Sequence, residues 1–260
     1  MHGLNNSFLY SAKKIIAHWG DNGNIIEIRG TGFFIEKDGV IFLVTNRHVV
    51  DPGYSDARWL GYHIVGMRIE SYSSFDENNF PIEKHIGDIE NYSEFTFHEN
   101  INNDIACLKN VRLKNGDMTI ICHIPYSMLA TEEWLSHLSV CDSIAYPGFP
   151  EWYDRQNDTP IFRMGTIASD PRLNYSYMPS SSKQNVIAYE GFSSSGASGS
   201  PVFSLQKGFP LGGGLEYSGP DDFYREVKVV GINAGHFSDT KGHSGISYFY
   251  KSSAIIEMID

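Results

Sequence analysis

A short segment rich in glycine and serine, Ser195-Gly196-Ala197-Ser198-Gly199-Ser200-Pro201, contains the strongest candidate nucleophile, Ser198. Serine is a weak nucleophile and needs a base, a group that orients the base, and donors for the developing oxyanion. Gly196 and Gly199 flank Ser198 and permit a tight turn that a side chain would obstruct. Such a turn can aim the amides of Gly196 and Ser198 at one point, as an oxyanion hole requires. Taken alone, the segment also fits a plain surface loop.

Two other segments offer the base and the group that orients it. His48 follows an apolar run at residues 40–45 after two intervening residues, and Asp104 directly precedes another run at residues 105–108. A histidine on such an element can accept a proton from serine, and a carboxylate can hold its tautomer. A core histidine and an acidic turn cap are the alternatives for each residue alone. The chain order His, Asp, Ser favours a joint catalytic role.

The elements that must position these residues are mostly short strands. Helical spacing of apolar residues occurs at residues 5–18, 126–139 and 252–259, and predicts a helix at each end and a short helix or linker between two halves. A hairpin turn is expected at residues 36–39, and long loops at 70–100. Period and composition predict strands at 24–35, 40–45, 61–69, 95–98, 105–108, 119–123, 143–146, 161–168, 186–189, 201–204, 227–234 and 245–250.

These strands divide into two sets of about six, which predicts an all-β fold of two six-stranded antiparallel β-barrels with an N-terminal and a C-terminal helix. The expected units are an N-terminal helical extension over 1–23 and a first barrel with His48 and Asp104 over 24–125. A connector over 126–140 and a second barrel over 141–260, with the nucleophile and the terminal helix, complete the chain.

With its order His48, Asp104, Ser198, the chain resembles the trypsin/chymotrypsin-like serine peptidases, whose triad spans two barrels. The resemblance covers roughly residues 24–260. It implies a serine endopeptidase that hydrolyses peptide bonds through these three residues and an oxyanion hole at Gly196 and Ser198. The matching pieces are GTGFFI (30–35), VTNRHVV (44–50), NDIACLK (103–109), YPGFP (146–150), GASGSP (196–201) and VVGINAG (229–235).

One departure concerns activation. Vertebrate digestive members have an Asp just before the nucleophile, which pairs with a newly cut amino terminus, whereas this chain has Ala197. The chain therefore resembles the bacterial and viral branch without a zymogen step. We expect a stand-alone enzyme regulated by a protein partner or a conformational switch.

The resemblance also implies a specificity pocket with Phe192 at its floor. Its walls would come from Ser193, Ser194 and Ser195, from Asn233, Ala234, Gly235 and His236, and from Gly245 opposite. A buried floor without a carboxylate predicts an uncharged residue before the scissile bond, because an unpaired buried Lys or Arg is costly. Relatives that cleave after Glu or Gln carry a histidine at the Asn233 position, so His236 or His243 can substitute. Plain loop histidines are the alternative.

Charge and cysteine content limit the partners and the compartment. The net charge is −11, with no basic cluster beyond Lys13-Lys14, which argues against nucleic-acid and membrane partners. The three cysteines are unclustered and form no zinc spacing, so no metal or cofactor is expected, and Cys107 fits a core position. Free thiols and the absence of a recognisable leader at the start of the sequence indicate the cytoplasm. The expected partner is a polypeptide substrate.

Other functions fit the sequence less well. An α/β-hydrolase esterase needs G-x-S-x-G, but Ser200 occupies the fifth position, and its acid should lie between serine and histidine. A zinc hydrolase needs HExxH or a His/Cys cluster, and the sequence has neither. A protease-fold binding module without turnover is the remaining alternative, although all three triad positions are filled.

Overall fold

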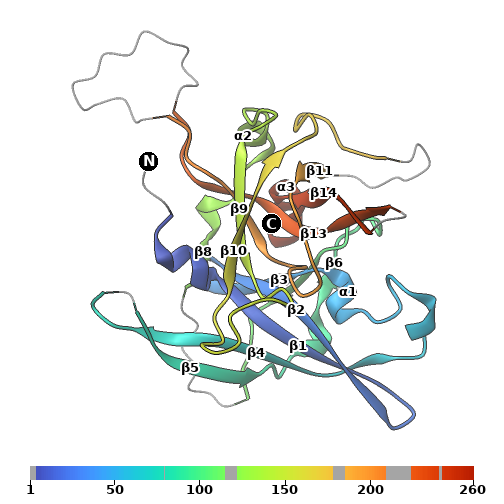
Figure 1. The fold of residues 1–260 in the computed structure, drawn as a ribbon. Coiled ribbons are helices and arrows are strands. Elements are labelled where there is room, and N and C mark those ends of the chain that lie inside the picture. The colour runs from blue at the N-terminus through green and yellow to red at the C-terminus, as the bar shows by residue number, and fades with distance from the viewer. Residues whose placement is uncertain (1–3, 79, 115–121, 178–184, 209–223, 240–241) are drawn as a thin grey trace.

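The computed structural model describes residues 4–78, 80–114, 122–177, 185–208, 224–239 and 242–260. Strands of the first half form one eight-stranded sheet in the order β5-β4-β1-β2-β3-β7-β6, with β8 paired in parallel to β2. Figure 1 shows the first strands of this sheet in blue at the bottom of the view. The strands are β1 (Ala12–Asp21), β2 (Asn24–Lys37), β3 (Val40–Thr45), β4 (His63–Phe75), β5 (Pro81–Asp88), β6 (Thr96–Phe97), β7 (Ala106–Lys109) and β8 (Ile124–Pro125).

Strands of the second half form a closed six-stranded antiparallel barrel in the order β10-β11-β14-β13-β12-β9. The second of the two expected barrels is therefore present. Its strands are β9 (Ser143–Gly148), β10 (Ile161–Ile167), β11 (Val186–Glu190), β12 (Pro201–Ser204), β13 (Lys228–Asp239) and β14 (Gly242–Lys251).

The first expected barrel stays a prediction. Among the strands that the structure describes, no ladder joins the two outer members of the first sheet, β5 and β6. The expected strand at residues 119–123 lies outside the described residues except for its last two positions. The domain boundaries expected at 125 and 140 also stay predictions.

Helices are few and short. α1 (Arg47–Val50) follows β3, α2 (Glu132–Leu135) lies in the connector, and α3 (Ser252–Ile259) closes the chain as expected. The remaining helical turns are 3₁₀ helices at Asn6–Ser11, Ala57–Trp59, Tyr92–Glu94 and Tyr126–Met128. None of the described helices is long and apolar enough to cross a membrane.

The expected N-terminal helix is wrong over most of its length. Only Asn6–Ser11 is helical, as one 3₁₀ helix, and residues 12–21 form β1, which pairs with β2 and β4 in the middle of the first sheet. Nearly every side chain of β1 is buried, including Lys13 and Lys14. A strand buried on both faces does not alternate polar and apolar residues, so its apolar positions also fit helical spacing. Residues 12–21 of the extension expected over 1–23 are thus part of the first sheet.

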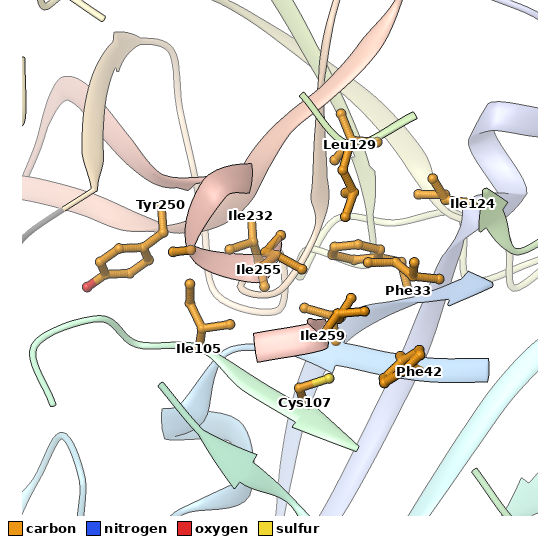
Figure 2. Close-up of a cluster of buried hydrophobic side chains, with 14 of the residues drawn as sticks. Phe33, Phe42, Ile105, Cys107, Ile124, Leu129, Ile232, Tyr250, Ile255 and Ile259 are labelled. Atoms are coloured by element: carbon orange, nitrogen blue, oxygen red, sulfur yellow. The ribbon is translucent and has the colours of Figure 1, made fainter. Parts of the chain in front are cut away.

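One apolar core joins the two halves of the chain (Figure 2). It contains Phe33 and Phe42 from the first sheet and Ile232 and Tyr250 from the barrel. α3 contributes Ile255 and Ile259, so the last helix packs between the two halves. Because this core is buried, it fixes the position of the first sheet relative to the barrel.

Candidate active site

His48 lies on α1, directly after the buried strand β3. Val49 and Val50 of this helix are buried, and the Trp19 indole N–H donates to the Val49 carbonyl at 3.2 Å. The helix is preceded by Asn46, whose side-chain amide donates to the Asp104 carbonyl at 2.7 Å. These contacts hold the half-buried His48 ring beside Asp104.

Asp104 contacts His48 with both carboxylate oxygens. Oδ2 lies 2.5 Å from His48 Nδ1, and Oδ1 accepts the backbone N–H of His48 at 2.8 Å. The neighbouring Ile105 is part of the core between the halves, and the Tyr250 hydroxyl donates to the Asn102 carbonyl at 3.0 Å. The expected pair of imidazole and carboxylate is therefore in contact, and Nε2 is the ring nitrogen left for a further proton transfer.

The surroundings of His48 raise the pKa of its imidazole above 6.5. Burial acts to lower this pKa, but the charge of Asp104 and the hydrogen bond with it raise the pKa by more. Asp104 therefore stabilises the imidazolium form, which a general base must adopt after it accepts a proton.

Ser198 lies in the tight turn that precedes β12. The turn contains Gly196 and Gly199 with φ of +88° and +89°, conformations that favour glycine. The Ser198 carbonyl accepts the backbone N–H of Thr31 on β2 at 2.8 Å, and the Gly199 N–H donates to the Asn233 carbonyl at 2.9 Å. The turn is thus bonded to the first sheet on one side and to β13 on the other.

The first sheet brings α1 and the Ser198 turn to the same place. A Cβ built on Gly30 of β2 would lie 2.9 Å from the Val49 side chain and 3.6 Å from the Ser198 carbonyl. The Ser198 hydroxyl itself donates to the Ala234 carbonyl at 3.4 Å, a long hydrogen bond. In the part of the chain that the structure describes, no hydrogen bond joins this hydroxyl to His48. The helix of His48 and the Ser198 turn meet at Gly30, while the expected contact between Ser198 and His48 is not made among the described residues.

The backbone amides of Gly196 and Ser198 have no internal partner among the described residues. The neighbouring amides are used, since Ala197 N donates to the Ser194 carbonyl at 3.0 Å and Gly199 N to Asn233. The N–H groups of Gly196 and Ser198 donate to no other described residue. These are the two donors expected for an oxyanion.

The expected pocket residues differ widely in exposure. The expectation that Phe192 forms a buried pocket floor is wrong, because its side chain is 59% exposed. The centroid of its ring lies 4.8 Å from that of the His243 ring. Ser193, Asn233 and Ala234 are buried, Gly235 and Gly245 are half-buried, and Ser195 and His236 are exposed. The pocket roles of these residues stay predictions.

Asn233 is fully buried and stabilises the turn that contains Ser198. Its amide nitrogen donates to Ser193 Oγ at 2.9 Å and to the Ala197 carbonyl at 3.0 Å, and its oxygen accepts from the Tyr189 hydroxyl at 2.7 Å. Every polar atom of this side chain is thus bonded to protein. The sequence predicted Asn233 as a pocket wall, whereas its contacts are with the loop that carries Ser198.

The sequence motifs assigned no role to Thr31, which links the two halves at the turn. Its hydroxyl donates to the Gly196 carbonyl at 2.7 Å and accepts from Phe149 N at 3.1 Å, and the side chain is fully buried. A polar residue in the apolar run of β2 is the signal that could have identified it, because buried hydroxyls require partners.

A metal site has no support in the described residues, where no group of three or more His, Cys, Asp and Glu side chains is placed to hold an ion. The three cysteines are free, and burial raises the pKa of the Cys107 thiol to about 12, in keeping with a core position.

Comparison with known proteins identifies relatives of this architecture. Residues 30–212 match the family model described as a trypsin-like peptidase domain. The HtrA-type protease AlgW with a decapeptide has a similar structure, with a TM-score of 0.55 and 13% identity over 98% of this chain and 66% of that chain. The serine endoprotease from Yersinia pestis is similar with a TM-score of 0.54 and 14% identity, over 100% of this chain and 66% of that one. This chain thus spans just under two thirds of the length of these structures. No curated protein matches it.

Proposed function

Since the chain belongs to the trypsin-like peptidase family, whose members are serine endopeptidases, we propose that it hydrolyses peptide bonds with Ser198, His48 and Asp104 as its catalytic triad. The contact between His48 Nδ1 and Asp104 Oδ2 at 2.5 Å carries this proposal. The Ser198 turn supports it, because this turn is bonded to the strand that also contacts the helix of His48.

The three residues divide the proposed reaction among them. Ser198 Oγ attacks the carbonyl carbon of the substrate, while His48 Nε2 accepts the hydroxyl proton. His48 then donates this proton to the leaving amine, and a water molecule releases the acyl group by the reverse sequence of proton transfers. Asp104 keeps the Nδ1–H tautomer and stabilises the imidazolium.

Ser198 must turn toward His48 before it can react. Its hydroxyl donates to the Ala234 carbonyl through a bond of 3.4 Å, which is weak enough to exchange for a bond to His48 Nε2. This step requires the half-buried Ser198 side chain to change rotamer and to give up its bond to Ala234.

The amides of Gly196 and Ser198 are proposed as the oxyanion hole. Both lack a partner among the described residues, and the positive φ of Gly196 supports a turn in which the two N–H groups converge. Backbone donors of this kind stabilise the charge that develops in the transition state, and loss of one such donor costs about 100- to 1,000-fold in rate.

Activation without a new amino terminus is part of the proposal. Ala197, just before the nucleophile, is fully buried and has no charge to pair with an ammonium group. We propose a cytoplasmic enzyme that cleaves polypeptides and is held in check by a partner or a conformational switch. The decapeptide in the AlgW structure supports a peptide as the class of substrate.

A cleavage assay tests the proposed activity. The full chain is incubated with a peptide library of mixed sequence, and new termini are identified by mass spectrometry. Cleavage that disappears in Ser198→Ala, with the thermal unfolding temperature kept, supports the peptidase. Intact peptides with the wild type, together with measurable peptide binding, would instead support a binding module without turnover.

A further inference from the structure

We infer that Arg163 is a specificity-determining residue that receives an acidic side chain of the substrate, together with the Ser194 hydroxyl and the ring pair His236 and His243. This inference rests on the proposed peptidase function, since the site is assigned to the substrate residue before the scissile bond. It differs from the sequence expectation of an uncharged residue there, whose premise was the buried floor at Phe192.

Arg163 points toward the nucleophile loop from the inner face of the barrel. It lies opposite Tyr146 in the pairing of β10 with β9, and opposite residues of an antiparallel pair share one face of the sheet. Tyr146 is fully buried, and its hydroxyl donates to the Phe192 carbonyl at 2.9 Å. Arg163 Nη1 donates to Ser194 Oγ at 3.0 Å. The guanidinium therefore lies at the segment that leads into the Ser198 turn.

Ser194 connects this charge to the nucleophile turn. Its carbonyl accepts the Ala197 amide at 3.0 Å, so the residue begins the turn that contains Ser198. Its hydroxyl accepts from Arg163, and among the described residues the hydroxyl proton has no acceptor. A carboxylate placed here can accept from both the Ser194 hydroxyl and the remaining N–H groups of Arg163.

No carboxylate of the described chain occupies this position. Among the described residues of this acidic protein, seven of the nine arginines form an ion pair with Asp or Glu, and Arg155 and Arg163 do not. Glu190 is close in sequence to Ser194 but lies opposite Thr166 in the pairing of β10 with β11. Thr166 faces outward, because side chains alternate along a strand and Arg163 faces inward. The Glu190 side chain is exposed on the outer face. Arg163 is therefore a half-buried guanidinium with no counter-charge among the residues that the structure describes, and it is available to a ligand.

Two histidines lie beside this charge, and their ring N–H groups can donate hydrogen bonds to a carboxylate. The rings of His236 and His243 are stacked, with 4.3 Å between their centroids, and the His243 ring contacts Phe192. Burial first, and then His236 and Arg163, lower the pKa of His243, although a backbone hydrogen bond with Ser193 opposes them. The influence of Arg163 and His236 on this pKa indicates that the three groups lie within electrostatic reach of one another. A bound carboxylate would offset their mutual repulsion, whereas a bound Lys or Arg would increase it.

Paired peptides that differ only in Glu or Gln before the scissile bond test the inference. These side chains have nearly the same shape, so the ratio of their kcat/KM values isolates the charge. We expect the wild type to favour Glu by about 10- to 100-fold, the range for a hydrogen bond to a charged group. In Arg163→Gln the ratio should fall to near 1, and Arg163→Lys, which keeps the charge, should retain part of it.

Arg155→Gln is the matched control, because Arg155 also lacks a carboxylate partner among the described residues and donates to the Glu151 carbonyl at 3.1 Å. This variant should keep the wild-type ratio. A Glu/Gln ratio that is unchanged in Arg163→Gln would overturn the inference. So would dominant cleavage after aliphatic or basic residues.

A binding measurement separates this inference from the proposed function. Peptides that end in Glu or Gln are titrated against Ser198→Ala by calorimetry, with and without Arg163→Gln. Tighter binding of the Glu peptide that is lost in Arg163→Gln supports the acidic site, even where the wild type cleaves nothing and the peptidase proposal fails. Equal binding of the two peptides would overturn the inference, even where the wild type is an active peptidase.

Discussion

Replacement of Gly199 by alanine should both destabilise the protein and inactivate it, because the new methyl group meets the backbone of the first sheet. A Cβ at this position would lie 1.9 Å from the Thr31 carbonyl oxygen and 2.7 Å from Thr45 Oγ1. Real Cβ contacts are essentially never below 3.0 Å, so the turn and β2 must separate by about 1 Å. The chain after Gly199 cannot easily move with it, because Pro201–Ser204 is a buried strand of the barrel.

The size of both effects follows from this geometry. A non-glycine residue in the left-handed region costs about 1–2 kcal/mol, and overpacking costs about 1–3 kcal/mol more. Gly199→Ala should thus lower the free energy of unfolding by about 2–5 kcal/mol. A displacement of about 1 Å at the nucleophile should lower kcat/KM by about 100-fold in the molecules that remain folded.

Gly23→Ala is the matched control for backbone strain. Gly23 has a φ of +88°, nearly the same as Gly199, but nothing lies within 4 Å of its built Cβ. This variant should lose only about 1–2 kcal/mol and keep full activity. Urea unfolding and the hydrolysis of one peptide substrate measure both quantities. Equal losses of stability and activity in the two variants would refute the argument from the contact with Thr31.

Two further predictions concern charged groups. Because the pKa of His48 is raised above 6.5, the hydrolysis rate should fall on acidification with a midpoint above pH 6.5. Asp104→Asn should move this midpoint downward and lower kcat on the order of 10⁴-fold. A midpoint that Asp104→Asn leaves unchanged would contradict the pairing of His48 with Asp104. Glu70 lies 2.5 Å from Lys14 and 3.0 Å from Lys84, and although burial raises its pKa, hydrogen bonds with both lysines lower it below 4.5 overall. The contribution of Glu70 to the free energy of unfolding is therefore present above pH 4.5 and lost as the pH falls through the lowered pKa. In urea unfolding, Glu70→Gln should lower this free energy by about 2 kcal/mol at pH 7 and by progressively less below pH 4.5. A difference between wild type and variant that stays constant with pH would argue against the ion pairs.

Local sequence rules predicted the elements that carry the candidate triad. His48 follows a buried strand, Asp104 precedes one, and the turn at Ser198 has the glycines that its positive φ angles require. The Asp38-Gly39 hairpin between β2 and β3 and the closing helix α3 also follow from composition and period. These features depend on neighbours in sequence, and a single chain is sufficient to predict them.

Features that depend on long-range burial could not be predicted in this way. β1 lies between β2 and β4 with nearly all of its side chains buried, and Lys13 and Lys14 have polar partners far along the chain. β5 is an edge strand in a polar stretch that was expected to contain loops. The exposure of Phe192 and the position of Arg163 at Ser194 result from the closure of the barrel, which no local pattern encodes.

Covalent labelling by a fluorophosphonate probe tests most directly whether Ser198 is the nucleophile. The full-length protein is labelled and digested, and the modified residue is identified by mass spectrometry in the wild type, Ser195→Ala, Ser198→Ala and Ser200→Ala. We predict an adduct on Ser198 in the wild type that persists in Ser195→Ala and Ser200→Ala and is absent from Ser198→Ala. An adduct on Ser195 or Ser200, or labelling that survives in Ser198→Ala, would contradict the account.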